Sequence, residues 1–185
     1  MVLLLSQHFS AKPIKVDDVR SNLWTKAIDE AAYTDEKAAY QAAILEQYKI
    51  YTEMADRSSA RRALANAFFL SLNTATLTAA GALWTSKLFA SWLLLLPLFL
   101  LLAQTGAWFW IVRSYRQLNT AKYIVVGMLE ERLPASPYWR AEWKALGEGK
   151  NKALYWPLTH LEQWLPIIFA GLYILGFLFA VVLPF

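Results

Sequence analysis

The sequence predicts an all-α membrane protein with three transmembrane helices, the first two forming a long antiparallel hairpin that extends into the cytoplasm. Hydrophobic residues make up 57% of the 185-residue chain and charged residues 17%, whereas soluble domains contain about 45–50% and about 25%. A membrane's hydrocarbon core needs about 20 mostly apolar residues of helix. Three stretches without a formal charge reach that length: residues 63–84, 88–112 and 165–185.

The first two spans should continue beyond the membrane as helical stalks, over residues 34–62 and 113–133. No Pro or Gly occurs from Ile14 to Ala80, and the hydroxyl of Thr34, followed by two acids, is a suitable helix N-cap. Pro134 should end the second stalk. A short outer turn at residues 85–87 forces the two helices to run antiparallel.

The rest of the chain is expected to form smaller elements around this hairpin. Residues 1–33 make an N-terminal cytoplasmic segment with a short helix near residues 17–32. Residues 134–164 make a cytoplasmic interfacial loop with a short amphipathic helix, predicted by the spacing of Trp139, Trp143 and Leu146.

The third span should begin at a capping box. Thr159 and Glu162 have the spacing of that motif, with His160 between them. Pro166 should kink the helix near its start.

The orientation follows from the distribution of Lys and Arg. Nine of these residues precede the first span, one (Lys87) lies between the first two spans, and eight lie in residues 113–164. The positive-inside rule therefore places the N-terminus in the cytoplasm and, after three spans, the C-terminus outside. Six tryptophans are predicted interfacial anchors: Trp84, Trp92, Trp108, Trp110, Trp156 and Trp164.

No catalytic, cofactor or metal site is expected, and the protein is interpreted as not an enzyme. The chain has no Cys, and its two histidines, His8 and His160, have no His or Cys partner at helical spacing. Residues 147–151 lack the pattern of a phosphate-binding loop. A nucleic-acid partner is not expected either, because the basic residues flank apolar segments, where anionic lipid headgroups are the nearer partner.

Two groups on the first helix are candidates for packing against other helices. Apolar residues of its stalk recur at the roughly 3.5-residue spacing of a coiled coil, and small or hydroxyl residues share a face of its span, where they favour close helix approach or line a pore. No ionisable residue lies in the middle of a span, which disfavours an active transporter. The packing candidates are Tyr40, Ile44, Tyr51, Met54, Ser71, Thr74, Thr78 and Gly81.

Charged residues cluster just before the first span. Asp56, Arg57, Arg61 and Arg62 lie at the level expected for lipid headgroups. They could form ion pairs between subunits or bind anionic lipid, and both interpretations stand at this point.

Two segments carry a family resemblance. Residues 45–62 (LEQYKIYTEMADRSSARR), running into residues 65–74 (ANAFFLSLNT), and residues 155–162 (YWPLTHLE) are similar to the RipA family of octameric bacterial inner-membrane proteins. The resemblance covers about residues 43–175. It implies a cyclic homo-oligomer in the bacterial cytoplasmic membrane. It also implies a link to envelope physiology or survival in host cells, and the family has no assigned enzymatic activity.

These observations lead to two functional hypotheses. The first is a non-enzymatic homo-oligomeric ring, octameric by resemblance, that organises membrane lipids or partner proteins at the inner face of the membrane. A ring would bury the apolar stripe of the stalk, which one hairpin cannot cover, through contacts that close on themselves. The alternative is an oligomeric channel or pore lined by the Ser/Thr face of the first transmembrane helix.

Overall fold

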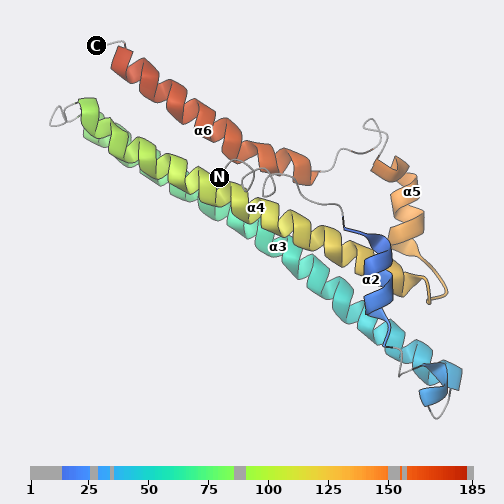
Figure 1. The fold of residues 1–185 in the computed structure, drawn as a ribbon. Coiled ribbons are helices and arrows are strands. Elements are labelled where there is room, and N and C mark those ends of the chain that lie inside the picture. The colour runs from blue at the N-terminus through green and yellow to red at the C-terminus, as the bar shows by residue number, and fades with distance from the viewer. Residues whose placement is uncertain are drawn as a thin grey trace. The chain divides into compact units, whose positions relative to one another are not determined.

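The structure, a computed structural model of the chain, describes residues 14–25, 29–33, 36–85, 91–149, 155 and 158–182. All regular secondary structure in these ranges is helical (Figure 1). Three of the helices are long and apolar enough to cross a membrane. The predicted all-α class with three candidate spans is therefore confirmed.

Helix α3 (Glu36–Thr85) contains 50 residues. At about 1.5 Å per residue it is about 75 Å long, more than twice the roughly 30 Å of a hydrocarbon core. The N-cap predicted at Thr34 lies outside the described residues. The first span was predicted to end at residue 84, and α3 continues through Gly81 to Thr85, because one helical glycine costs only about 1 kcal/mol relative to alanine.

Helix α4 (Leu95–Glu130) follows the short 3₁₀ helix η2 (Ser91–Leu94). It therefore begins later than the expected residue 88, and residues 86–90, including most of the predicted turn, lie outside the described part. Pro97 is the third residue of α4, where its missing N–H removes no helical hydrogen bond.

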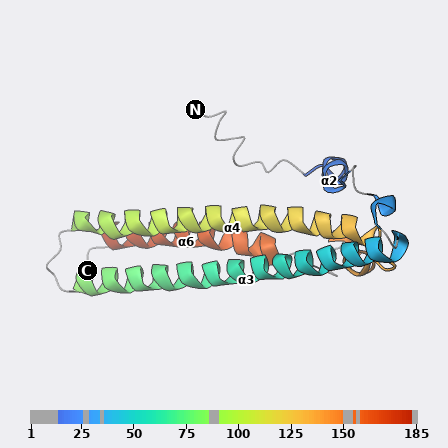
Figure 2. The same cartoon turned by 90° about the horizontal axis from the view of Figure 1, so that it is seen from below.

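The chain divides into two compact units, and α3 and α4 contribute to both. The stalk unit contains residues 1–58 and 117–156, and the membrane unit contains residues 59–116 and 157–185. Helix α6 (Leu158–Val182) belongs to the membrane unit, where Figures 1 and 2 show it alongside the other two helices. Pro166 is buried within α6, which the structure assigns as one helix.

The core of the membrane unit is aromatic. Phe69, Trp108 and Val112 are buried together, and Phe169 of α6 packs against them. The rings of Phe69 and Trp108 are stacked, with centroids 6.3 Å apart, and the rings of Trp108 and Phe169 are 5.8 Å apart. This cluster joins all three long helices.

The stalk unit adds shorter helices to α3 and α4. The segment predicted near residues 17–32 forms α2 (Val16–Leu23) and the 3₁₀ helix η1 (Glu30–Ala32). After α4 come the π-helix η3 (Pro137–Glu142), α5 (Trp143–Ala145) and the 3₁₀ turn η4 (Gly147–Gly149).

The predicted amphipathic helix of the interfacial loop is thus π-helical in its first part. The N–H of Ala141 donates to the carbonyl of Ser136, five residues earlier, at 3.1 Å. The Trp139 ring packs directly against Gly127 of α4. A Cβ atom added to Gly127 would lie only 2.5 Å from a carbon of this ring. Glycine is therefore required at position 127 by the close approach of the two segments.

Candidate functional site

The charged end of the membrane unit holds an excess of positive charge. Residues 59–116 and 157–185 contain four arginines at this end, Arg61 and Arg62 on α3 and Arg113 and Arg116 on α4, but only one carboxylate, Glu162 of α6. We call this group the arginine band. It lies where the charge-free part of each helix gives way to its charged part.

Two residues of α6 tie that helix to the other two. Arg62 Nε lies 3.0 Å from Glu162 Oε2, and the two side chains are only 15% and 24% exposed. The neighbouring Gln163 Oε1 accepts a hydrogen bond from Arg116 Nη1 at 2.7 Å. Glu162 was expected in a capping box, but its carboxylate pairs with Arg62 of α3; the side chains of Thr159 and His160 lie outside the described part.

Trp108 occupies a different position from the one the sequence suggested. It was assigned to the interfacial belt, yet it is only 2% exposed and lies in the core of the membrane unit. Its Nε1–H donates to Asn66 Oδ1 at 2.8 Å. Because this bond satisfies the indole N–H, the large ring can fill the space between the three helices without an unpaired donor.

The other described tryptophans of the predicted belt are accessible. Trp84, Trp110 and Trp164 are 38%, 44% and 59% exposed. The Arg113 guanidinium carbon lies 5.8 Å from the centroid of the Trp110 ring, a cation–π distance. Trp156 and the side chain of Trp92 lie outside the described residues.

The Ser/Thr stripe of α3 does not pack within the membrane unit. Ser71, Thr74, Thr78 and Gly81 are all exposed in the single chain. The hydroxyls of Thr74 and Thr78 donate to carbonyls four residues earlier in α3, at 2.8 and 2.9 Å. The face toward α4 instead contains Asn66, Phe69, Asn73 and Thr76.

The packing candidates of the stalk are partly buried. Ile44 is 4% exposed, Tyr40 accepts a hydrogen bond from Arg132, and Lys122 Nζ lies 4.9 Å from the centroid of the Tyr51 ring. Met54, however, is 47% exposed, whereas its neighbour Ala55 is 2% exposed. The spacing of apolar residues in the sequence pointed to Met54, the larger of the two side chains. The residue that is buried in the structure is its smaller neighbour, Ala55.

The four charged residues before the first span separate into two groups. Arg57 is paired with Glu53 at 2.6 Å and Arg62 with Glu162. Asp56 and Arg61 are exposed, and neither has an ion pair or hydrogen bond within the described part of the chain.

A polar hub that was not predicted from the sequence lies at the end of α4. Glu130, only 1% exposed, accepts hydrogen bonds from four donors of the stalk unit. They are Tyr48 Oη at 3.1 Å, Ser136 Oγ at 2.7 Å, Tyr138 N at 3.1 Å and Trp139 N at 2.9 Å.

The next two residues extend the hub to the N-terminal segment. Glu131 pairs with Arg20 of α2 at 2.6 Å, and the Arg132 guanidinium carbon lies 3.5 Å from the centroid of the Trp24 ring. An acid in the last turn opposes the helix dipole, which is the signal that could have drawn attention to Glu130.

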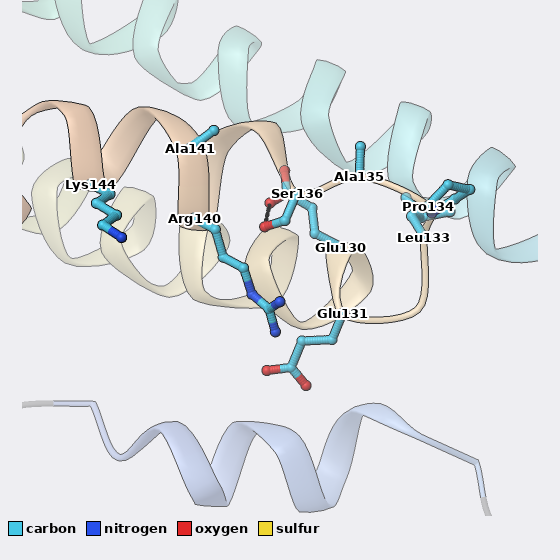
Figure 3. Close-up of a pocket in the computed structure, with 9 residues that line it drawn as sticks. All are labelled: Glu130, Glu131, Leu133, Pro134, Ala135, Ser136, Arg140, Ala141 and Lys144. Atoms are coloured by element: carbon cyan, nitrogen blue, oxygen red, sulfur yellow. Dashed lines mark hydrogen bonds between the residues drawn. The ribbon is translucent and has the colours of Figure 1, made fainter.

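An open cavity of about 370 Å³ lies beside this hub (Figure 3). Its walls include Glu130, Glu131 and two basic residues, Arg140 and Lys144. The Arg140 side chain points toward Glu131 in this view. Among the described residues, no group of three His, Asp or Glu side chains is placed to hold a metal ion.

The hub predicts an alkaline transition that depends on Tyr48, which lies in the stalk part of α3. The pKa of Tyr48 is raised from 10.0 to about 12. Burial of the phenol is the largest cause, and the hydrogen bond to Glu130 is the second. Between these two pH values the unfolded chain ionises this phenol and the folded chain does not. The stabilisation is therefore present below pH 10.0 and is lost as pH rises toward about 12.

The measurement is tyrosinate absorbance together with unfolding between these pH values. Tyr48→Phe should remove one late-titrating phenol and weaken the loss of stability over this interval. An identical pH dependence of stability in wild type and Tyr48→Phe would show that the Tyr48–Glu130 contact does not control it.

Comparison with known proteins gives one match. A family model described as the octameric membrane protein family (8xMP) matches residues 45–182, which include most of α3 and all of α4. No curated protein and no solved structure matches the chain.

Proposed function

The chain belongs to the octameric membrane protein family, and from that premise we propose that it is a non-enzymatic scaffold that organises anionic lipid around the rim of a homo-oligomeric ring. The octameric family expected from the sequence is confirmed by the match. The sequence leaves open whether the ring organises lipid or partner proteins. The charged and aromatic residues of the membrane unit favour lipid. The proposal places the ring in the bacterial inner membrane, with the N-terminus and the arginine band on the cytoplasmic side.

The arginine band carries this proposal. The band of each copy has four arginines and one carboxylate, Glu162, which Arg62 already engages. Basic residues near an anionic membrane surface contribute about 1 kcal/mol each. A symmetric ring repeats the band in every copy, so the positive charge forms a continuous belt at the headgroup level.

The exposed tryptophans support the same level for the membrane surface. Trp110 lies next to Arg113, and Trp164 follows the two α6 residues that tie the helices together. Tryptophan prefers the headgroup region, where the ring is partly in hydrocarbon and the N–H is hydrated.

The test is the lipid that remains with the protein when it is extracted in native nanodiscs. Two surface charges would contribute about 2 kcal/mol of attraction, or roughly 30-fold in binding. Arg113 is only 8% exposed and Arg116 donates to Gln163, so Arg113→Gln with Arg116→Gln should weaken the binding of phosphatidylglycerol or cardiolipin by less than this upper value, but still several-fold. Lipid mass spectrometry of the extracted particles measures this change.

Two controls separate charge from structure. Arg113→Lys with Arg116→Lys keeps the charge and should retain the anionic lipid. Arg140→Gln with Lys144→Gln removes the same charge from the stalk unit and should leave the lipid unchanged. Equal lipid content in wild type and the Gln variant of the band would refute the proposal.

The second candidate is a channel lined by the Ser/Thr stripe. The exposure of Ser71, Thr74 and Thr78 favours it, because a ring could direct these hydroxyls toward its centre. The hydroxyl hydrogens of Thr74 and Thr78 are satisfied within α3, which makes the stripe equally suited to packing against another helix.

A further inference from the structure

Asp56 and Arg61 are opposite charges on one helix without an intramolecular partner in the described residues. Their neighbours Arg57 and Arg62 are paired with Glu53 and Glu162. Five residues along an unbroken α-helix separate two positions by about 140° around the axis and about 7.5 Å along it. The two side chains therefore leave α3 in different directions and do not face each other.

Arg61 belongs to a flank of α3 that carries large side chains. Ile50, Met54, Leu64 and Phe68 are 51%, 47%, 71% and 59% exposed. Together with Arg57 and Arg61 they follow one another at alternating spacings of four and three residues, so they share one face of the helix. We call this face the bulky flank.

Asp56 belongs to a flank that carries small side chains. Ala60, Ala63 and Ala67 are all exposed and share its face of the helix, up to Leu70, which is 46% exposed. Small residues allow a second helix to approach closely within a membrane. We call this face the small flank.

The other two membrane helices expose large apolar side chains as well. Phe99 of α4 is 76% exposed, and Leu175 and Phe179 of α6 are 63% and 62% exposed. Such bulky apolar side chains suit lipid chains as neighbours. Exposed small residues also occur on α4, at Ala103, Gly106 and Ala107. Among the described parts of the three long helices, α3 is the one whose bulky and small flanks carry exposed charges of opposite sign.

A closed ring of identical subunits requires a head-to-tail contact between two different, complementary faces. The flanks of α3 are complementary in size and in charge. We propose that the bulky flank of one copy packs on the small flank of the next, with Arg61 of one subunit paired with Asp56 of its neighbour. The inference rests on the oligomer of the proposed function and is independent of its lipid.

The position of the pair favours its formation. Arg61 lies two residues before Ala63, where the charge-free part of α3 begins. Near the headgroups the effective dielectric is lower than in water, which strengthens an ion pair. A ring would repeat this pair at every subunit boundary.

The absence of cysteine from the chain permits a direct test by disulfide cross-linking in native membranes. Asp56→Cys with Arg61→Cys should give, after mild oxidation, a ladder of covalent species up to eight subunits. A bond within one chain is excluded, because the two Cα atoms of an i, i+5 pair in a helix are more than about 7 Å apart. Each single Cys variant should remain uncross-linked, and a mixture of the two should give covalent dimers.

A matched control uses two exposed positions with the same spacing on α4. Leu118→Cys with Tyr123→Cys should give no ladder. A second test exchanges the charges: Arg61→Asp alone should lower the detergent resistance of the oligomer at least several-fold, and Asp56→Arg added to it should restore wild-type resistance.

The outcomes distinguish this inference from the proposed function. An intact octamer that shows no cross-links in the double Cys variant and no loss of detergent resistance in Arg61→Asp would overturn the Asp56–Arg61 contact and leave the scaffold in place. Cross-linking of Asp56→Cys alone would show a two-fold contact and overturn the head-to-tail arrangement. Loss of anionic lipid from Arg61→Asp with unchanged detergent resistance would assign Arg61 to lipid instead. A monomeric wild type would contradict the scaffold itself.

Discussion

Glu130→Ala is expected to destabilise the stalk unit by about 3–5 kcal/mol. The substitution removes the acceptor of four hydrogen bonds, two of them from the first N–H groups of the π-helix η3. Buried donors that lose their acceptor bear the full desolvation cost. Hydrogen exchange should therefore accelerate in residues 137–145, and thermal unfolding should begin at a lower temperature.

Two further variants identify the cause. Glu130→Gln keeps one acceptor oxygen and should have an intermediate effect. Glu131→Ala breaks the more exposed pair with Arg20 and should have a smaller effect on η3, because exposed pairs contribute little. Equal exchange rates in η3 for wild type and Glu130→Ala would show that the hub does not hold this segment.

Trp108→Ala is expected to cost about 3–5 kcal/mol in the membrane unit. The change leaves a cavity between Phe69, Val112 and Phe169 and removes the donor to Asn66. The matched control is Trp110→Ala, because Trp110 is 44% exposed and Trp108 only 2%. Unfolding by a denaturing detergent measures both variants, and equal losses would contradict the buried position of Trp108.

The three spans could be predicted because hydrophobicity and the absence of charge are local properties of the chain. Long charge-free runs have few structural alternatives when backbone groups must be satisfied internally. The stalk of α3 followed from the absence of Pro and Gly between Pro13 and Gly81, and the end of the α4 stalk followed from Pro134. The start of α4 at Leu95 was less predictable, since an apolar sequence has the same composition before and after a helix end.

Which side chains face the core could not be predicted, because sequence position gives depth in the membrane but not direction around the helix. Trp108 has the depth of an interfacial anchor, yet it points toward α3 and α6. Ser71, Thr74 and Thr78 share a face as expected, but spacing alone does not say whether that face meets α4 or a neighbour.

The polar hub could not be predicted because its donors are far from Glu130 in sequence. Tyr48 is 82 residues away, and Trp139 is nine residues away across a turn. The fold brings them together only after α3 and α4 have paired. The ion pair between Arg62 and Glu162 depends on tertiary structure in the same way.

The central claim is that copies of this chain form a ring that holds anionic lipid at its positively charged rim. Native mass spectrometry of wild-type protein released from native nanodiscs tests it most directly, because one spectrum reports both subunit number and bound lipid. We expect eight copies that retain phosphatidylglycerol or cardiolipin in preference to neutral lipid. A monomer, or an octamer that carries no excess of anionic lipid, would contradict it.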